Sequence, residues 1–369
     1  MPEVYEGKRV AVLSWRAPGD PEAGGSELHA REIFSRWTQR GVDVTMFARR
    51  HDGERHDVGA DFEIVNVGSE YTVFPRAAFR AIRTRRRFDA LVEILNGVPF
   101  WSPIWWRGRS VVWLHHLHTE MWAQTLPRPI AAAGRWNETT VVPRVYRSSR
   151  VVTLADTGRL ALTRAGFANV TAIEPGVSEA FTPACTTTRA VHGGGEKFRL
   201  ISVGRLAPVK RWLELFAALE PLASQITLDV IGDGPQGSEL REWQRRHDAH
   251  WLHLLGRVDE DELVRRYQTA DLLVSASSAE GWGMTITEAA RCGVPAVVTD
   301  VLGHRAAVVD GMTGELVPSP DHLTDVIRRL LDDPARRARF ASAAQSRAAN
   351  MTWDAAAERH LRELFGRTL

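Results

Sequence analysis

The sequence predicts an α/β fold made of two doubly wound, Rossmann-like domains that face a central cleft. At 369 residues the chain is long for one core and has room for two domains. Apolar runs of strand length alternate with helical patterns, as in βαβ units around a parallel sheet, and this alternation lapses once before it starts again. Because such sheets bind ligands at the carboxyl ends of their strands, two of them would share a cleft.

The N-terminal domain is expected over residues 1–177. Its first strand is followed by a helix from about Ser26 to Arg40, in which apolar residues recur at helical spacing. The later apolar runs are short enough for buried strands. The expected strands are RVAVLSW, VDVTMFA, DALVEIL, SVVWLHH, RVVTLA and VTAIEP.

A linker is expected over residues 178–197, where Pro183, a threonine run and Gly193 to Gly195 interrupt the pattern. Residues 198–346 then form the second domain. Its expected strands are FRLISVG, ITLDVIG, HLLG, DLLVSAS and PAVVTD, with helices from Arg211, Ser238, Glu260 and Gly283. Residues 347–369 contain an amphipathic helix, MTWDAAAERHLRELF, which is expected to pack back toward the N-terminal domain.

Composition narrows the class of protein. Charged residues make up 25% and hydrophobic residues 44%, which is ordinary for a globular protein, and a formal net charge of +2 argues against a nucleic-acid partner recruited by bulk charge. The two cysteines, Cys185 and Cys292, lack metal spacing and suit a reducing compartment. The N-terminus carries no apolar signal segment and no run approaches a membrane span. We therefore expect a cytoplasmic protein, soluble or peripheral to the inner face of the membrane.

The segment EGWGMTITE places two carboxylates, Glu280 and Glu288, on either side of a glycine turn. The preceding residues predict a strand, and the following ones a helix that opens at Gly283 and closes at Gly293. Amides of Gly283 and Met284, at the positive end of the helix dipole, would face the phosphates of a ligand. Glu288 would accept hydrogen bonds from vicinal hydroxyls such as those of a ribose. A plain turn with two solvated glutamates is the alternative interpretation.

Several segments together resemble glycosyltransferase family 4, whose members are retaining nucleotide-sugar transferases of the GT-B fold. The resemblance covers essentially the whole chain, and it is strongest from Val203 to Pro318 and less specific in the first domain. The segments, in family order and spacing, are GGSE, VGRLAPVK, VIGDGP, LLGRV, EGWGMTITEAARCGVPAVVTD and DGMTGELVP.

The resemblance implies that Arg205 and Lys210, after the strand LISVG, neutralise the donor's diphosphate as it leaves. Surface charges that flank a helix start are the alternative. Gly24 and Gly25 would let the backbone of the first domain, which is the acceptor side, approach the same phosphates. A bare pair of glycines is otherwise only a turn.

The remaining donor contacts are also implied by the family. Glu280 would bind hydroxyls of the donor sugar, Glu288 the ribose, and Arg257 and Val258 would lie near the base. The implied donor set also includes Gly281, Gly283, Met284 and Thr285. The donor is a co-substrate of the UDP or GDP type, and no other cofactor is implied.

The segment WLHHLHTE ends a predicted strand of the first domain, and His115 best matches the family's histidine near the sugar, where a neutral imidazole can donate to a hydroxyl. His116 is one residue away and stays an alternative. Three histidines with Glu120 also suggest a zinc site, although their spacing matches no familiar metal motif. Loop histidines without chemistry are the larger competitor.

The family implies reaction on one face of the sugar, with the leaving diphosphate assisting deprotonation of the acceptor, so no protein nucleophile and no metal ion are assigned. The catalytic set is therefore His115, Arg205, Lys210 and Glu280. Asp259 to Asp261 resembles a metal-binding D-x-D but opens a predicted helix, where N-capping is the simpler explanation. GDGPQG matches a dinucleotide fingerprint, yet it follows the second strand of its domain and contains Pro235.

Two features of the first domain bear on the acceptor. One is a group of tryptophans, for which core packing competes with binding of sugar rings or of an apolar acceptor. The other is a predicted helix from Pro75, whose arginines would bind an anionic membrane surface or a phosphorylated acceptor, or form a solvated basic face. The tryptophans are Trp101, Trp105, Trp106, Trp113, Trp122 and Trp136, and the arginines are Arg76, Arg80, Arg83 and Arg87.

The sequence therefore predicts a metal-independent, retaining glycosyltransferase that moves a sugar, most simply a hexose, from a nucleotide-diphosphate donor. The acceptor is a small molecule, a sugar or a lipid-linked compound. Two alternatives stay open: a noncatalytic nucleotide-sugar-binding scaffold, and a phosphorylase of the same fold. Phosphorylases of that kind carry pyridoxal phosphate on a lysine, and only Lys8, Lys197 and Lys210 occur here.

Overall fold

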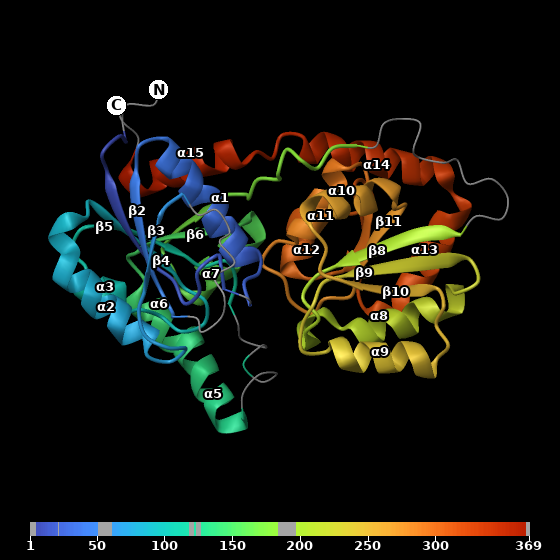
Figure 1. Ribbon diagram of the computed structural model, residues 1–369, viewed down its shortest axis with the longest axis horizontal. Helices are drawn as coiled ribbons and strands as arrows, with labels where there is room; N and C mark the ends of the chain where they lie inside the picture. Colours follow the sequence, from blue (N-terminus) through green and yellow to red (C-terminus); the bar gives the residue numbers. More distant parts are fainter. Residues whose placement is uncertain are drawn as a thin grey trace. The chain divides into compact units, whose positions relative to one another are not determined.

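The computed structural model describes residues 5–20, 22–50, 61–117, 122, 127–183 and 197–366. The chain forms two compact units (Figure 1). Unit 1 comprises Met1–Gly176 and Trp353–Leu369, and unit 2 comprises Val177–Thr352. Both units contain a parallel sheet with helices on its two faces, so the predicted α/β fold is confirmed. The predicted cleft stays a prediction, because each unit is described by itself, and most of the predicted linker lies outside the described residues.

Unit 1 is built on a parallel sheet whose described strands run in the order β3-β2-β1-β4-β5-β6-β7. The order reverses between β1 and β4, as it does in doubly wound folds. The edge strand β3 was not expected, because its four half-exposed residues form no buried apolar run. The strands are β1 (Arg9–Leu13), β2 (Asp43–Ala48), β3 (Glu63–Asn66), β4 (Ala90–Ile94), β5 (Arg109–Trp113), β6 (Arg150–Thr153) and β7 (Asn169–Ala172).

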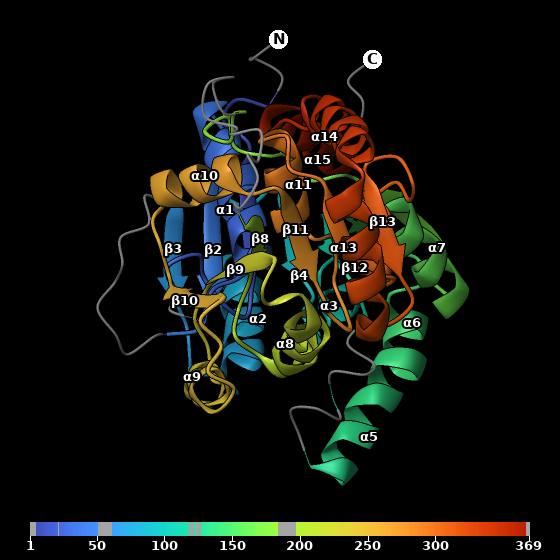
Figure 2. The same cartoon turned by 90° about the vertical axis from the view of Figure 1, so that its right-hand side faces the viewer.

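Helices cover both faces of this sheet. The first helix, α1, packs against the last helix of the chain, α15, which thus belongs to unit 1. In Figures 1 and 2, α5, the π-helical turn η2 and α6 run on as one rod that projects from the sheet. The helices are α1 (Gly25–Gln39), α2 (Val73–Thr84), η1 (Arg85–Arg87), α3 (Ser102–Trp105), α5 (Arg128–Trp136), η2 (Asn137–Val141), α6 (Val142–Val145), α7 (Asp156–Ala165) and α15 (Trp353–Phe365).

Aromatic rings fill the layer between the sheet of unit 1 and the pair α1 and α15. Trp113 of β5 contacts His29 of α1 and His360 of α15, with ring centroids 4.9 and 4.5 Å away. Both histidines are 1% exposed, and neither ring has a hydrogen-bond partner among the described residues. Burial keeps both imidazoles neutral: it lowers the pKa of His29 well below its ordinary value, and it lowers that of His360 to about 3.

The tryptophan-rich segment divides between core and surface. Trp113 and Trp106 are buried, which fits the core-packing interpretation. Trp136 of α5 is 60% exposed, and Trp101 and Trp105 are half-buried.

The arginine-rich helix differs from the expectation in one respect. The helix α2 ends at Thr84, whose hydroxyl donates to the carbonyl oxygen of Arg80, and the chain tightens into the 3-10 turn η1. Arg87 lies in that turn, so it does not continue the row of arginines along α2.

Unit 2 repeats the architecture with a parallel sheet in the order β10-β9-β8-β11-β12-β13 among its described strands. Here the order reverses between β8 and β11. The edge strand β13 was not expected, because its sequence, GELV, begins with glycine and offers only two apolar residues. The strands are β8 (Phe198–Val203), β9 (Ile226–Ile231), β10 (Leu252–Gly256), β11 (Leu272–Ser275), β12 (Ala296–Thr299) and β13 (Gly314–Val317).

A continuous apolar core fills unit 2 between the sheet and helices α8, α9 and α13. The other face is covered by α10, α11 and α14, of which α11 and α14 pack closely together. The helices are η3 (Pro208–Lys210), α8 (Trp212–Leu219), η4 (Glu220–Leu222), α9 (Gly237–Arg246), α10 (Glu260–Thr269), α11 (Met284–Arg291), α12 (Leu302–Ala307), η5 (Pro320–His322), α13 (Leu323–Asp332) and α14 (Pro334–Ala348). Among the described residues, no helix is long and apolar enough to cross a membrane.

Two misleading motifs have structural explanations. Gly232 and Gly234 adopt positive φ angles, and a Cβ atom at either would lie within 2.6 Å of a carbonyl oxygen of the chain that follows β8. These glycines therefore allow two loops to pass closely. The Asp259 side chain accepts a hydrogen bond from the Glu262 amide and caps α10, as expected for a helix start.

The buried histidines of unit 1 predict acid sensitivity. Both have a lowered pKa in the folded chain, so below pH about 6.5 the unfolded chain binds protons that the native chain excludes, and stability falls as pH falls. We expect the unfolding free energy to drop by about 4 kcal/mol between about pH 7 and pH 5 through this pair, about 2 kcal/mol for each histidine. Urea unfolding at both values measures the drop.

Replacing His360 with leucine is expected to reduce this pH dependence. His250→Leu is the matched control, because the His250 side chain is 87% exposed. An equal slope for His360→Leu and the native chain would contradict the assignment.

Candidate active site

The point where the strand order reverses in unit 2 gathers the candidate donor residues. Arg205 and Lys210 follow β8, and Glu280 follows β11, the neighbouring strand on the other side of the reversal. In doubly wound sheets generally, the loops after two such strands diverge to opposite faces, and ligands bind at this point. These residues belong to separate sequence motifs, and the strand order brings them to the same edge of the sheet of unit 2.

Lys210 and Glu280 form an ion pair. The Lys210 Nζ atom donates to Glu280 Oε1 over 2.5 Å, and the Ser277 hydroxyl donates to the same oxygen over 2.8 Å. The lysine stem crosses Gly204 at the end of β8, where a Cβ atom would lie 3.0 Å from Lys210 Cε. Both charged side chains are less than one-fifth exposed, so the pair is shielded from water.

Charge in this cluster is balanced by its neighbours. Burial alone would raise the pKa of Glu280, but Lys210, assisted by His304 and Ser277, lowers it to about 2. His304 Nδ1 donates to the carbonyl oxygen of Thr299 over 2.6 Å, since a carbonyl can only accept. Burial lowers the pKa of His304, and the neighbouring Glu280 carboxylate opposes this shift.

The turn before α11 is held tightly. Gly283 has a φ angle of 97°, in the left-handed region, and caps the helix that starts at Met284. Trp282 is 2% exposed and anchors the turn in the core. A Cβ atom on Gly303 would lie 2.5 Å from the Glu280 carbonyl oxygen, so α12 supports this turn directly. The first amides of α11, at Met284 and Thr285, have no acceptor within the helix and are suited to an anion.

Glu288 lies one turn into α11, on a side buried by α10. The Tyr267 hydroxyl donates to Glu288 Oε2 over 3.1 Å. Burial raises the pKa of Glu288 to about 7, although the tyrosine hydrogen bond opposes the shift. The two glutamates of the EGWGMTITE segment are therefore electrostatically different, because one has a lysine partner and the other a phenol.

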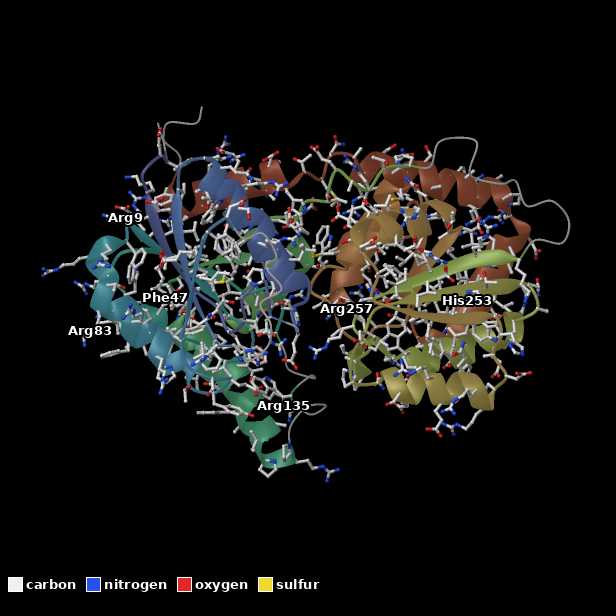
Figure 3. All side chains as sticks on the ribbon, in the orientation of Figure 1. Arg9, Phe47, Arg83, Arg135, His253 and Arg257 are labelled. Atoms are coloured by element: carbon white, nitrogen blue, oxygen red, sulfur yellow. The ribbon has the colours of Figure 1, made fainter. Side chains whose placement is uncertain are left out.

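The other candidates of unit 2 lie at the ends of neighbouring strands. Arg257 and Val258 directly follow β10, and Figure 3 shows Arg257 at the carboxyl end of this strand, which also carries His253. Arg205 is exposed directly after β8, and its carbonyl oxygen accepts a hydrogen bond from the Trp212 ring over 3.2 Å. Gly281 is half-buried in the turn before α11.

In unit 1 the loop that ends in Gly24 and Gly25, which we call the glycine loop, connects β1 to α1. It follows a strand at the sheet reversal, as the loop after β8 does in unit 2. The Gly24 amide donates to the Glu27 side chain over 2.8 Å, and Gly25 is the first residue of the helix. The Asn96 side chain, after β4, donates to the Ser26 hydroxyl over 3.1 Å. The two strands that flank the reversal in this sheet are thus joined at the loop.

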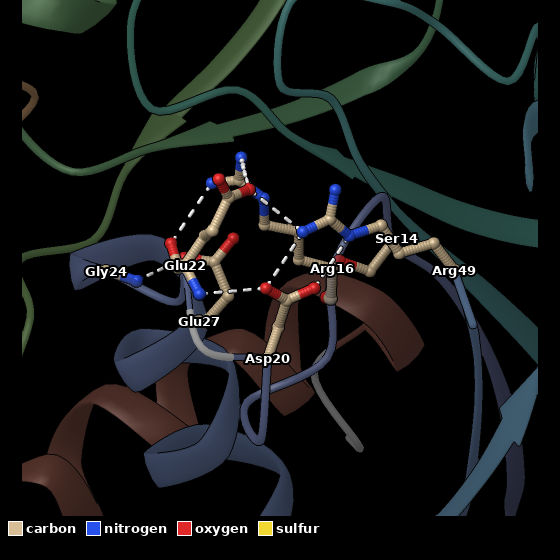
Figure 4. A network of polar contacts seen from close by, with 7 residues as sticks. All are labelled: Ser14, Arg16, Asp20, Glu22, Gly24, Glu27 and Arg49. Atoms are coloured by element: carbon tan, nitrogen blue, oxygen red, sulfur yellow. Dashed lines mark hydrogen bonds and ion pairs between the residues drawn. The ribbon is translucent and has the colours of Figure 1, made fainter. Parts of the chain in front are cut away.

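An ion-pair network fixes the rest of the glycine loop (Figure 4). Arg49, after β2, donates to both oxygens of Asp20 over 2.7 and 2.9 Å and also to Glu22. Arg16 donates to Glu22 over 2.7 Å, and its guanidinium carbon lies 4.0 Å from the centre of the Trp15 ring. Two arginines therefore hold a loop that the sequence marked only by its glycines.

His115 lies at the end of β5 and is buried. Its ring centroid is 5.1 Å from that of His29, one turn into α1, so His115 and the glycine loop belong to the same edge of unit 1. His116 is half-buried. Within the described part of the chain, no group of side chains could hold a metal ion, and Glu120 of the alternative zinc site lies outside it.

Sequence reasoning missed several residues of these clusters. They lie outside the recognised motifs, and serine, asparagine, histidine and tyrosine at single loop or helix positions carry no pattern of their own. The salt-bridged arginines could have been suspected only from the acidic residues of the same loop. The missed residues are Ser277, His304, Tyr267, Asn96, Arg16 and Arg49.

Comparison with known families explains this arrangement. The model described as Glycosyltransferase Family 4 matches residues 23–181, and the one described as Glycosyl transferases group 1 matches residues 186–347. The chain belongs to glycosyltransferase family 4. It is an enzyme of the glycosyltransferase class, and the resemblance recognised in its motifs is confirmed.

Relatives and solved structures agree with this family. D-inositol 3-phosphate glycosyltransferases of Kineococcus radiotolerans and Xylanimonas cellulosilytica are 29% and 27% identical, over 98% and 95% of this chain and 96% and 95% of their own. Sucrose-phosphate synthase from Thermosynechococcus elongatus matches with a TM-score of 0.80 at 20% identity, covering 98% of this chain and all of the other. Anabaena HepE, solved with UDP and glucose, matches with a TM-score of 0.77 at 20% identity over 97% and 99%. The fold is GT-B.

The ion pair of unit 2 can be tested without a substrate. Lys210→Met is expected to lower the unfolding free energy by about 1–3 kcal/mol, because it leaves the Glu280 carboxylate without its cation in a shielded position. Adding Glu280→Gln to this variant should recover part of the loss. Denaturant unfolding of the two single variants, the double variant and the native chain gives the coupling free energy. A coupling of zero would exclude an interacting pair.

Proposed function

We propose that the protein transfers a hexosyl group from a UDP or GDP sugar to an acceptor hydroxyl, with retention of anomeric configuration and without a metal ion or cofactor. The observation that carries this proposal is the Lys210 and Glu280 pair beside the start of α11, at the strand reversal of unit 2. A cation, a carboxylate and a helix amino end at one edge suit a sugar linked to a diphosphate. The complexes of HepE with UDP and with UDP-glucose make UDP the first nucleotide to test.

We assign each part of the donor, from the base to the sugar, to residues of unit 2. The base lies by Arg257 and Val258, the ribose hydroxyls bind Glu288, and the diphosphate binds Arg205 and Lys210. The phosphates also receive hydrogen bonds from the helix start, and the sugar hydroxyls bind Glu280. The backbone positions involved are Gly281, Gly283, Met284 and Thr285 of unit 2 and Gly24 and Gly25 of unit 1.

Donor binding changes the partner of Lys210. In the structure its ammonium group is neutralised by Glu280. A diphosphate near Lys210 competes for this ammonium group and frees carboxylate lone pairs for the sugar hydroxyls. Before the exchange the carboxylate is ionised, because Lys210 lowers its pKa against the effect of burial. One ion pair thus couples recognition of the sugar with recognition of the leaving group.

In the reaction the bond between the anomeric carbon and the diphosphate oxygen breaks while the acceptor oxygen attacks from the same face. The acceptor proton passes to an oxygen of the leaving diphosphate. Negative charge grows on the diphosphate, where Arg205, Lys210 and the amides of α11 stabilise it. His115, as a neutral imidazole, donates to a sugar hydroxyl. No protein nucleophile takes part.

The acceptor is assigned to unit 1 and is a small molecule, a sugar or a lipid-linked compound. The names of the relatives, D-inositol 3-phosphate glycosyltransferase, support a small polyhydroxylated acceptor as the first choice. We place the protein in the cytoplasm, with peripheral contact at the inner face of the membrane through the arginine-rich segment of α2, and without a nucleic-acid partner. The arginines assigned to this contact are Arg76, Arg80 and Arg83 of α2 and Arg87 of η1.

The pKa of Glu288 predicts how UDP binding depends on pH. Only the carboxylate accepts two hydroxyl hydrogen bonds, and its pKa of about 7 leaves roughly a tenth ionised at pH 6. We therefore expect UDP to bind about tenfold more weakly at about pH 6 than at high pH, with a plateau above about pH 8. Titration calorimetry over this range measures the effect.

Glu288→Gln should remove most of this pH dependence and weaken binding by about 1.5–3 kcal/mol, and Lys210→Ala should weaken binding by a similar amount while keeping the slope. Glu242→Gln on α9, 59% exposed, is the control. Unchanged affinity in both site variants would remove the donor site from this edge of unit 2.

The stereochemistry of the product tests the mechanism. With UDP-glucose and a polyhydroxylated acceptor such as inositol phosphate, we expect turnover in excess EDTA and a product with the donor's anomeric configuration, because fixed cations replace a metal ion. Proton NMR of the fresh product gives the anomeric coupling. An inverted product, or activity that is lost with EDTA and returns with manganese, would refute this mechanism.

A further inference from the structure

An open groove in unit 1 lies beside α2. It has a volume of about 530 Å³ and runs between the turn after β3 and the exposed face of the helix. The lining combines arginines with an aromatic ring and with loop residues, and no residue of the candidate active site contributes to it. The lining residues are Asn66, Val67, Gly68, Pro75, Arg76, Phe79, Arg80 and Arg83.

This surface carries unbalanced positive charge. Residues 71–88 include six arginines and no acidic residue, and all six are exposed. None of them forms an ion pair with another described residue, although Arg83 stacks over the Phe79 ring at 5.5 Å. Figure 3 shows Arg83 extending from α2 into solvent. A chain with a net charge of only +2 thus concentrates six charges on one short segment. The six are Arg76, Arg80, Arg83, Arg85, Arg86 and Arg87.

Apolar side chains are exposed on the same segment. Tyr71 is 81% exposed, Phe79 58% and Ile82 42%. They are not needed to attach the helix, because Ala77 and Ala81 are fully buried against the sheet and already do so. Exposed aromatic and aliphatic side chains between arginines are typical of helices that lie in a membrane interface.

The helix α9 of unit 2 shows the contrast. It also carries exposed arginines, Arg241, Arg245 and Arg246, but they alternate with Glu239 and Glu242, and Arg246 pairs with Glu242 over 3.6 Å. An ordinary solvated helix face balances its charge in this way. Residues 71–88, which we call the α2 segment, contain no acidic residue that could balance their arginines.

We infer that the α2 segment docks on a lipid bilayer that carries anionic headgroups. Headgroup phosphates occupy the groove between the arginines, and Phe79 and Ile82 insert at the level of the first acyl carbons. Charge complementarity selects this partner: an anionic leaflet attracts each nearby arginine, while the apolar side chains gain only from a surface that has an apolar interior. A soluble phosphate would leave these apolar side chains in water. The inference rests on and deepens the peripheral membrane contact of the proposed function, while it concerns unit 1 alone and does not depend on the proposed reaction.

Vesicle sedimentation tests the inference with the whole chain. The probes are vesicles of pure phosphatidylcholine and vesicles with equal parts of phosphatidylcholine and phosphatidylglycerol. We expect binding to the anionic vesicles only, weakened by high salt as exposed charges are screened. In the variant Arg76→Gln/Arg80→Gln/Arg83→Gln, the partition coefficient should fall about 100-fold, since each basic residue near the surface contributes a factor of about five.

Two further variants separate charge from insertion. Phe79→Ser/Ile82→Ser keeps all arginines, and it should bind anionic vesicles at low salt and lose the binding that persists at high salt. Arg241→Gln/Arg245→Gln/Arg246→Gln removes the same charge from α9 and should bind like the native chain. All of the replaced side chains are exposed, so each variant should keep the native fold, which circular dichroism verifies.

The inference is overturned if the triple α2 variant binds anionic vesicles like the native chain, or if the α9 variant loses binding equally. It is also overturned if neutral vesicles bind as well as anionic ones, because charge would then not select the partner. Competition by inorganic phosphate or by short duplex DNA at concentrations below that of the lipid would assign the groove to a soluble anion or to nucleic acid instead.

Discussion

The ion pair between Lys210 and Glu280 is the interaction on which the candidate donor site depends. It joins the loops after β8 and β11, the two strands that meet where the sheet of unit 2 reverses its order. A carboxylate shielded from water needs such a partner, because an isolated buried charge would become protonated or destabilise the fold. The pair therefore holds the turn before α11 in place and keeps its carboxylate ionised. In the proposed function, a diphosphate competes with Glu280 for this ammonium group.

In unit 1, ion pairs also hold a loop of the candidate site in place. The glycine loop also follows a strand at the sheet reversal, but Arg49 and Arg16 fasten this loop through Asp20 and Glu22. A ligand can approach a glycine backbone closely only if that backbone is already in place, because glycine by itself is flexible. The network fixes this backbone through Arg49, which lies outside the loop, and through Arg16 within it. Rigidity near the glycines and the pair in unit 2 are thus two forms of preorganisation.

Two sets of unpaired polar side chains in the described structure have different consequences. His29 and His360 are buried and neutral, which makes the packing of α15 on α1 sensitive to acid but compatible with neutral pH. The arginines of α2 are exposed and unbalanced, which costs little in water and leaves their charge available to a partner. Burial thus decides whether an unpaired group affects stability or association.

The sequence by itself determined the two α/β domains, the turn and helix around EGWGMTITE, and the family, because apolar periodicity and glycine positions are local signals. It missed the edge strands β3 and β13, whose short sequences form no buried run. Only the tertiary structure decided that Lys210 pairs with Glu280, that Tyr267 binds Glu288, and that these two carboxylates consequently have opposite pKa shifts. Such partners come from strands and helices far apart along the chain, and burial, which sets the pKa, exists only once the chain has folded.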